Sequence, residues 1–334
     1  MSRIKTCVSL YSLQHEYMTK KMSLEDIFRF MHENSVDGVE FLPDQMMHGA
    51  PHPSEETLAE WDRLCEQYQI KPVIADVFLN TNLYANRELT KKECVDLLID
   101  EIKLAHRLGM KMIRLVSMTP AFVLEPLLPY CEKYDVKMAL EIHAGLSFDK
   151  QKTKDYIEEM KRLNSPYIGL VIDTGIFCSR IPRVMENYCK NLGTSQAPID
   201  YVNKLFAEGK DGRDVYGPDG DFIPELKALL HSGADHMYAH FADGYEHEKF
   251  EVLDDLMPYI FHVHFKLFEM TDDGEYSIDY KGLLQYLHDH DYDGYVSTEY
   301  EGNRWTLPGA PMVEKEQVIA HQKYIRDCLK EIQG

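Results

Sequence analysis

The sequence predicts a (β/α)8 barrel on the basis of three observations. Eight short runs of apolar and β-branched residues alternate with stretches of helical periodicity. The chain has 334 residues, while a barrel of this class needs about 250, so one long insertion fits. No GxGxxG, P-loop or GxSxG motif follows a predicted strand, which disfavours a doubly wound open sheet.

Several of the predicted strands are apolar on both faces. Such runs are typical of strands covered by helices outside and by packed side chains inside a barrel. The predicted strands, in chain order, are 4–12, 38–43, 71–78, 112–117, 136–143, 168–175, 260–267 and 294–300.

Helix signals fall between these strands. Ser23, with Asp26 three residues later, is a variant of the capping box and predicts a helix start. The stretch 90–109 has apolar residues at helical spacing and ends at Gly109. The last predicted helix covers about 313–332.

One connection is much longer than the others. It runs from about residue 176 to 259, between the sixth and seventh strands, and contains helical pieces at 186–192, 199–209 and 221–233. We therefore expect one barrel domain over 1–334 with a helical insertion at about 176–259. Because βα loops lie at the face that carries active sites, this insertion is expected to emerge there, where it could be a lid or a docking surface.

Composition excludes several classes of partner. The formal net charge of −20 disfavours phosphate backbones and anionic lipids, so no nucleic-acid or membrane partner is expected. No apolar run approaches the roughly 20 residues of a membrane span, and the N-terminal stretch lacks a signal-peptide core. The seven cysteines form no CxxC pair, which favours a reduced, cytoplasmic setting.

Ionisable residues gather at the ends of four consecutive predicted strands. In a barrel, these carboxyl-terminal ends meet at the mouth where chemistry takes place. The residues are Glu141 and His143 on the fifth strand, Asp173 on the sixth, His262, His264 and Lys266 on the seventh, and Glu299 with Glu301 on the eighth.

Two glutamates, one aspartate and one histidine from these strands form a mixed oxygen and nitrogen ligand set. Three neighbouring carboxylates repel one another unless a cation lies between them. The set suits Mn²⁺, Mg²⁺, Co²⁺ or Zn²⁺, with either His262 or His264 as the nitrogen ligand, since both share a face.

Taken singly, some of these residues have simpler interpretations. Asp173 could cap the next helix, Glu301 could be solvated, and Lys266 could extend its ammonium group to solvent.

Short motifs on the last four strands resemble the sugar isomerase/epimerase-like barrels related to xylose isomerase. They are "EIH" on the fifth strand, "VIDTG" on the sixth, "HVHFK" on the seventh and "DYDGYVSTEYEG" on the eighth. The resemblance implies that the metal ligands are Glu141, Asp173, His264 and Glu299. Two positions depart from the family pattern: Ile176 replaces the usual His after "DTG", and Leu267 the Asp that often follows "HxK".

Longer phrases resemble the large (α) subunits of bacterial C-glycoside deglycosidases. These phrases are "VSLYSLQHEY", "FLPDQMMHGAPHPS", "LVSMTPAFVLEPLLPYCEKYDV", "LEIHAGLSFD" and "IDTGIFCSRIPRV". The resemblance implies a divalent metal, usually Mn²⁺, and a small all-β partner subunit in a hetero-oligomer. It also implies a small-molecule substrate, a C-glucoside already oxidised at the 3-position of its sugar.

The implied enzyme is a metal-dependent lyase: the C2 proton of the 3-oxo sugar is removed, the metal stabilises the enediolate, and the C–C bond to the aglycone breaks by elimination. We expect His143 to act as the base, because it shares a strand face with Glu141 and neutral imidazole accepts protons near pH 7. Lys266 is expected to stabilise an oxyanion.

Three alternatives remain open. A ketose isomerase or epimerase would use Glu141 and Glu299 to pass protons. A nuclease of the endonuclease IV type is disfavoured by the acidic charge. A non-catalytic sugar-binding or scaffold subunit would hold a structural metal.

Overall fold

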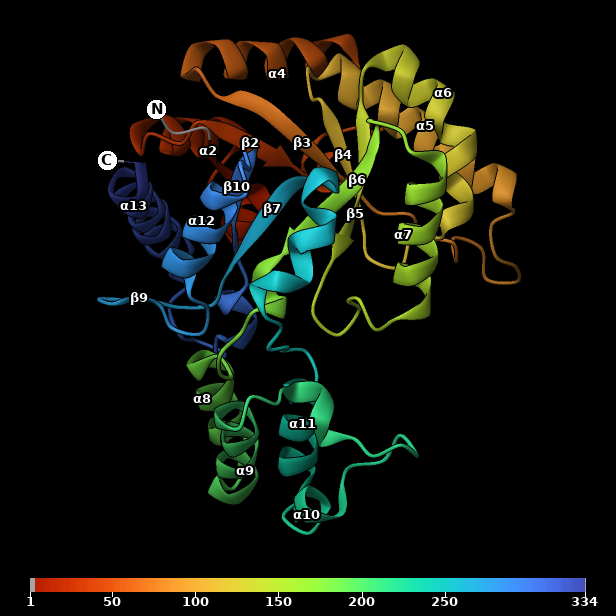
Figure 1. Ribbon diagram of the computed structural model, residues 1–334. Coiled ribbons are helices and arrows are strands. Elements are labelled where there is room, and N and C mark those ends of the chain that lie inside the picture. The colour runs from red at the N-terminus through yellow and green to blue at the C-terminus, as the bar shows by residue number, and fades with distance from the viewer. Residues whose placement is uncertain (1–3, 334) are drawn as a thin grey trace.

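A computed structural model describes residues 4–333, and in this part of the chain eight parallel strands close into a barrel. Neighbours follow the order β1-β10-β7-β6-β5-β4-β3-β2, and Figure 1 shows the barrel with its surrounding helices. The predicted (β/α)8 fold class is confirmed. The barrel strands are β1 (Lys5–Ser9), β2 (Gly38–Phe41), β3 (Lys71–Val77), β4 (Met112–Leu115), β5 (Lys137–Ile142), β6 (Ile168–Asp173), β7 (Ile260–Leu267) and β10 (Tyr295–Tyr300).

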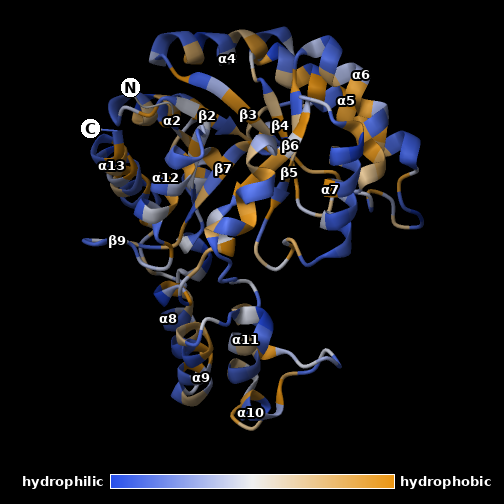
Figure 2. Cartoon of the chain, viewed as in Figure 1, coloured by the Kyte–Doolittle hydropathy of each residue, from blue (hydrophilic) through white to orange (hydrophobic). Residues whose placement is uncertain are grey.

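Helices surround the barrel and bury its outer face, and Figure 2 shows hydrophobic residues along the strands with hydrophilic residues over the outer helices. The core between the two layers is centred on large rings: Trp61 lies 4.5 Å from Phe41 and 5.5 Å from Phe28, centroid to centroid. The long outer helices are α2 (Leu24–Glu33), α4 (Glu55–Tyr68), α5 (Lys91–Arg107), α6 (Leu124–Tyr134), α7 (Gln151–Leu163), α12 (Tyr280–Asp289) and α13 (Glu314–Gln333).

Short elements connect these layers. They are η1 (Leu10–Leu13), α1 (Gln14–Met18), α3 (Pro43–Met46), η2 (Ala121–Val123), η6 (Gly302–Trp305) and the two-stranded ribbon of β8 (Met270–Thr271) and β9 (Gly274–Glu275). No helix among residues 4–333 is long and apolar enough to cross a membrane.

The helix boundaries follow their capping signals. Ser23 and Asp26 form the expected capping box at the start of α2. Helix α5 ends at Arg107, and Gly109 follows with φ of 78°, a left-handed conformation that glycine adopts without steric cost.

The connection between β6 and β7 forms a lobe on the side of the barrel where the strands end, seen below the barrel in Figure 1. Of the three helical pieces expected in this connection, the one at 221–233 is wrong in part. The stretch 221–233 forms only the short α10, and a longer helix begins where it ends, because Ser232 and Asp235 make a capping box there. The lobe contains η3 (Thr174–Ile176), α8 (Arg183–Asn191), α9 (Gln196–Ala207), η4 (Gly212–Val215), α10 (Pro224–Lys227) and α11 (Gly233–Ala242), and η5 (Phe250–Tyr259) leads back to β7.

A buried carboxylate ties this lobe to the barrel. Glu246 is fully buried, and its oxygens accept hydrogen bonds from the Gly145 backbone amide at 2.8 Å and the Ser147 hydroxyl at 2.5 Å. Both donors lie in the loop after β5, and Arg213 of the lobe lies 3.6 Å from the same carboxylate. The lobe is therefore held against the loop that follows His143.

Candidate active site

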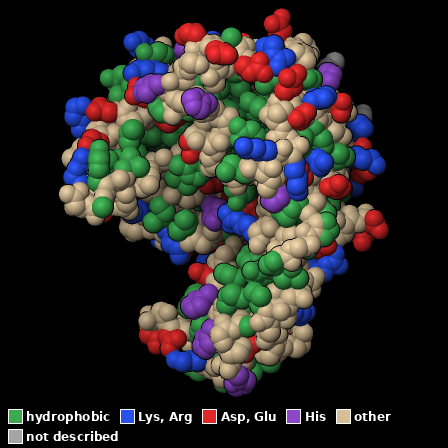
Figure 3. Space-filling model, turned by 180° about the vertical axis from the view of Figure 1, so that it is seen from behind, with side chains coloured by type: hydrophobic (Ala, Val, Ile, Leu, Met, Phe, Trp, Pro, Cys, Tyr) green, Lys and Arg blue, Asp and Glu red, His purple; other side chains and the backbone are tan. Residues whose placement is uncertain are grey.

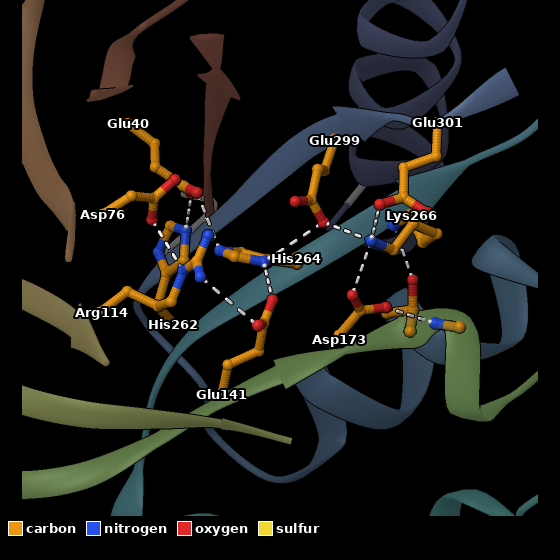
Figure 4. Close-up of polar contacts among 12 residues, drawn as sticks. Glu40, Asp76, Arg114, Glu141, Asp173, His262, His264, Lys266, Glu299 and Glu301 are labelled. Atoms are coloured by element: carbon orange, nitrogen blue, oxygen red, sulfur yellow. Dashed lines mark hydrogen bonds and ion pairs between the residues drawn. The ribbon is translucent and has the colours of Figure 1, made fainter. Parts of the chain in front are cut away.

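The four strand-end residues predicted as a ligand set come together at the mouth of the barrel. One ligand atom from each of Glu141, Asp173, His264 and Glu299 lies within 4.8 Å of the others, and all four side chains are buried. They come from the adjacent strands β5, β6, β7 and β10, whose register pairs Asp173 and Ser297 with His264. Figure 4 shows His264 pointing between Glu141 and Glu299.

His264, rather than His262, belongs to this set. Its Nδ1 lies 3.0 Å from a Glu141 oxygen and 3.3 Å from a Glu299 oxygen, while its Nε2 lies 2.9 Å from Glu40. Burial alone would lower the pKa of His264, but Glu40 and Glu299 raise it well above the ordinary value. His262 lies deeper and pairs with the other Glu40 oxygen at 3.0 Å.

The surroundings of this ring fit a metal ligand. A carboxylate beside Nε2 favours the tautomer with its proton on that nitrogen, which leaves the Nδ1 lone pair facing Glu141 and Glu299. Two carboxylates around Nδ1 are accommodated by a proton on that nitrogen, which the raised pKa of His264 favours, or by a metal cation in its place. The carboxylates and the imidazole are also donors that divalent metals accept.

Lys266 places an ammonium group among the same carboxylates. Its Nζ lies 2.8 Å from Asp173, 2.8 Å from Glu299 and 3.1 Å from Glu301. The side chain is 3% exposed, so the expectation of an ammonium group extended to solvent is wrong. Burial would lower the pKa of Lys266, but the neighbouring carboxylates, Asp173 first, raise it well above its usual range. Burial would raise the pKa of Glu299, and Lys266 with His264 lower it to about 2.

Two simpler interpretations of single residues have different outcomes. One Asp173 oxygen accepts a hydrogen bond from the Gly175 amide at 2.7 Å and so caps η3, while the other faces Lys266. Asp173 therefore caps a turn and also contributes to the cluster. The expectation of a solvated Glu301 is wrong, because this residue is 6% exposed and pairs with Lys266 and Arg304.

Three charged residues of the cluster were missed by the sequence reasoning. Arg114 on β4 donates a hydrogen bond to Asp76 on β3 at 2.8 Å, and it also lies 3.5 Å from Glu141. Glu40 on β2 holds both histidines. All three interrupt short apolar strands (GVEF, KPVIADV and MIRL), and that interruption was the signal available in the sequence.

His143 follows β5 directly and lies at the boundary of two cavities, of about 190 Å³ and about 290 Å³. Its Nδ1 is buried and has no hydrogen-bond partner among the described residues. The cavities share His143, Lys266, Glu301 and Arg304. This position gives the imidazole access to a bound ligand.

The two positions that depart from the family pattern, Ile176 and Leu267, are fully buried apolar side chains. Neither can contribute a ligand atom. The predicted set of four does not depend on them.

Residues 28–180 match the family model for the xylose isomerase-like TIM barrel. The chain is 25% identical over 339 aligned residues to the 3'-dehydrocarminate deglycosidase alpha subunit of a Microbacterium species, covering 98% of this chain and 96% of that one. It is 27% identical to a C-glycoside deglycosidase alpha subunit of Arthrobacter globiformis, over 89% of this chain and 84% of that one.

Among solved structures, L-ribulose 3-epimerase superposes with a TM-score of 0.58 at 11% identity, covering 99% of this chain and 96% of that one. At this identity the likeness concerns the fold. Residues 28–180 thus match the xylose isomerase-like TIM barrel model, and the chain is similar over most of its length to a 3'-dehydrocarminate deglycosidase alpha subunit and to a C-glycoside deglycosidase alpha subunit.

Proposed function

We propose that the chain binds a divalent cation through Glu141, Asp173, His264 and Glu299. The observation that supports this most directly is the convergence of their ligand atoms within 4.8 Å in a buried site. Oxygen and imidazole donors suit Mn²⁺, Mg²⁺, Co²⁺ or Zn²⁺, and Mn²⁺ is our first expectation. When bound, the cation would act as a Lewis acid toward a substrate oxygen.

We further propose that the chain is the alpha subunit of a C-glycoside deglycosidase. Of two relatives that align over most of its length, one carries that description, and the other is named as the alpha subunit of a 3'-dehydrocarminate deglycosidase. The proposed substrate is accordingly a C-glucoside whose sugar is oxidised at the 3-position. We also propose a small β-rich partner subunit in a hetero-oligomer; the relatives' description as alpha subunits supports a partner, and its size and fold are what the family resemblance implies.

The proposed chemistry follows from the bond to be broken. A C–C glycosidic bond has no leaving oxygen to protonate, so the paired-carboxylate hydrolysis of O-glycosides does not apply. A 3-oxo group makes the hydrogen on C2 acidic. His143 takes that proton, and the C2–H electron pair forms a C1–C2 double bond. The C1–aglycone bond breaks, its pair remains on the aglycone carbon, and that carbon takes up a proton.

Residues around His143 have supporting roles in this proposal. Arg114 and Lys266 lower the pKa values of Glu141 and Glu299, which favours their ionised forms, and they hold Asp76 and Asp173 in place. All three protons of the Lys266 ammonium face carboxylates in this structure. Stabilisation of an oxyanion by Lys266 would therefore require one of these pairs to open. That role remains a prediction.

A ketose epimerase is the alternative that the fold keeps open. It would need Glu141 and Glu299 as proton carriers, but Lys266 and His264 hold the pKa of Glu299 at about 2. Such a carboxylate is a weak base. The ion pairs therefore favour His143 as the proton acceptor.

The test combines metal analysis with turnover of a 3-oxo C-glucoside by the chain with its partner subunit. His143→Gln should retain bound metal and lose at least about a hundredfold in rate, the usual contribution of a general base. The control is His106→Gln, on the outer surface at the end of α5. Full turnover by His143→Gln, or activity on free ketoses alone, would contradict the proposal.

A further inference from the structure

The proposed elimination needs two proton-transferring groups, and His143 supplies one of them. His143 takes the proton from C2, while the aglycone carbon takes up a proton as its bond to C1 breaks. Figure 3, seen from behind, shows hydrophobic side chains gathered on the lobe where it meets the barrel. This apolar surface beside the mouth favours a donor supplied by the chain over bulk water, because a side chain holds its proton in a fixed position. The donor should line the same cavity as His143.

Most hydrogen-bond donors of this cavity are committed to other groups. Six described residues that line the cavity of about 190 Å³ have donor side chains: Tyr11, Arg114, Ser117, His143, Lys266 and Arg304. The guanidinium groups of Arg114 and Arg304 do not give up protons near neutral pH. The ammonium protons of Lys266 face three carboxylates, and the Ser117 hydroxyl donates to the Glu141 carbonyl at 3.0 Å. Besides the proposed base, the tyrosine remains.

The hydroxyl of Tyr11 is free to donate its proton. Its oxygen accepts a hydrogen bond from Arg304 Nε at 3.1 Å, and the hydroxyl donates to no other residue within 4–333. Burial raises the pKa of Tyr11, and Glu301 raises it further, so the hydroxyl keeps its proton near neutral pH. After that proton has left, the Arg304 guanidinium is in place to stabilise the phenolate through a charge-assisted hydrogen bond.

Tyr11 and His143 stand on opposite sides of the barrel mouth. Tyr11 lies in η1, just after β1, and His143 follows β5 directly. These two strands are four places apart in either direction around the closed barrel, and both residues line the same cavity. A ligand between them therefore meets a base on one side and an acid on the other. That arrangement suits an elimination, in which one proton is removed while another is delivered elsewhere on the substrate.

We propose that Tyr11 is the acid that protonates the aglycone carbon, with Arg304 as the positioning residue that stabilises the resulting phenolate. The inference rests on the proposed function. His143 takes the C2 proton, and the electron pair of the C1–aglycone bond moves to the aglycone carbon. That pair forms a C–H bond with the proton of the Tyr11 hydroxyl. The phenolate then regains a proton, and the imidazolium loses one, through solvent, so the step needs no oxidant or reductant.

The experiment separates proton removal from bond cleavage. The chain with its partner subunit and Mn²⁺ is incubated in D2O with a 3-oxo C-glucoside of a trihydroxybenzene. Cleavage is followed by release of the arene, and exchange by deuterium at C2 of the recovered substrate, with a protein-free mixture as background. Tyr11→Phe should lose at least about a hundredfold in cleavage rate and should accumulate deuterium at C2, because His143 still removes the proton and the intermediate returns to substrate. His143→Gln should lose both.

Tyr286→Phe is the matched control, because it also removes one hydroxyl, which donates to Asp254 on the outer surface at 2.6 Å. It should cleave and exchange like the wild type. Full cleavage by Tyr11→Phe would overturn the inference, as would a parallel loss of cleavage and exchange in a variant that keeps its bound Mn²⁺. If Tyr11→Phe does not fold, Arg304→Met gives the second comparison. It should slow cleavage about tenfold, the value of a hydrogen bond to a charged group, and keep C2 exchange, and a parallel loss of both would overturn the inference.

The two readouts also separate this inference from the proposed function. A wild-type protein that neither exchanges C2 nor cleaves the substrate would contradict the proposed function itself. A wild-type protein that does both, with a Tyr11→Phe variant that shows no separation of exchange from cleavage, would contradict the role of Tyr11 alone.

Discussion

Replacing Lys266 by methionine isolates the electrostatics of the site. Methionine keeps most of the side-chain volume and removes the charge, so Asp173, Glu299 and Glu301 lose the ammonium group that lies 2.8–3.1 Å from each of them. All of these side chains are at most 8% exposed. Removing one partner from a buried ion pair costs about 3–5 kcal/mol, and we expect Lys266→Met to lose that amount in the free energy of unfolding.

The assay is urea unfolding of metal-free protein, with the midpoint and slope fitted together. The matched control is Lys281→Met, because Lys281 lies 2.6 Å from Glu331 in a pair whose side chains are 59% and 64% exposed. Such a surface pair contributes at most about 1 kcal/mol. The same substitution should therefore have very different effects at the two positions.

Added Mn²⁺ extends the test to the proposed cation site. Without the ammonium group, the carboxylates should bind the cation more tightly, so saturating Mn²⁺ should stabilise Lys266→Met more than the wild type. In metal-free protein, the difference in unfolding free energy between the wild type and Lys266→Met should also decrease as the pH falls from about 8 to about 5. The unpaired buried carboxylates have raised pKa values in the folded state and take up protons there first. A Lys266→Met protein within about 1 kcal/mol of the wild type would refute the reasoning.

Other substitutions test neighbouring parts of the molecule. Arg114→Met should lose about 3–5 kcal/mol of unfolding free energy, because Asp76 is left unpaired in a buried position. Adding Asp76→Asn should recover part of this loss, as measured by urea unfolding; no recovery would contradict the pairing. His321 is buried, and burial lowers its pKa to about 3. Below about pH 6.5 the unfolded chain therefore takes up a proton at this residue that the folded chain does not. The free energy of unfolding consequently decreases as the pH falls. The loss amounts to about 1.4 kcal/mol per pH unit. It should disappear in His321→Gln but persist in His52→Gln, an exposed control. Parallel plots of unfolding free energy against pH for His321→Gln and the wild type would contradict this prediction. Glu246→Gln should cost about 1–3 kcal/mol by disturbing the bonds to Gly145 and Ser147, and it should raise the KM for an aryl C-glucoside; an unchanged KM would show that the lobe does not depend on this anchor.

The barrel and the convergence of Glu141, Asp173, His264 and Glu299 were predictable because strand ends in a barrel share one mouth. Polar residues at the ends of apolar strands, such as Asp173 and Glu299, could be grouped without any coordinates. The choice between His262 and His264 could not be made in this way, because the two residues share a face and differ only in depth. That choice is set by Glu40, which approaches from β2, far away in the sequence.

The residues missed by prediction share a physical reason. A single charged residue within a short strand, such as Arg114, has no local partner, and its interpretation depends on which strand lies beside it. Helix α11 was missed because the helical periodicity of 221–233 predicted a helix that ends where α11 begins. The capping residue Ser232 marks the observed start of α11. Sequence periodicity gives the element type more reliably than its ends.

The charge of the whole cluster gives an independent reason to expect a cation. Around the barrel mouth, the described residues include six buried carboxyl groups linked through shared partners: Glu40, Asp76, Glu141, Asp173, Glu299 and Glu301. Their buried cationic partners are Arg114, Lys266 and His264. Burial raises the pKa of Asp76 and of Asp173, as expected where negative charge exceeds positive charge in a region shielded from water. A divalent cation between Glu141, Asp173, His264 and Glu299 would offset most of that excess. Its binding should therefore release protons, and an equal proton count with and without Mn²⁺ would show that the cluster balances its charge by protonation alone.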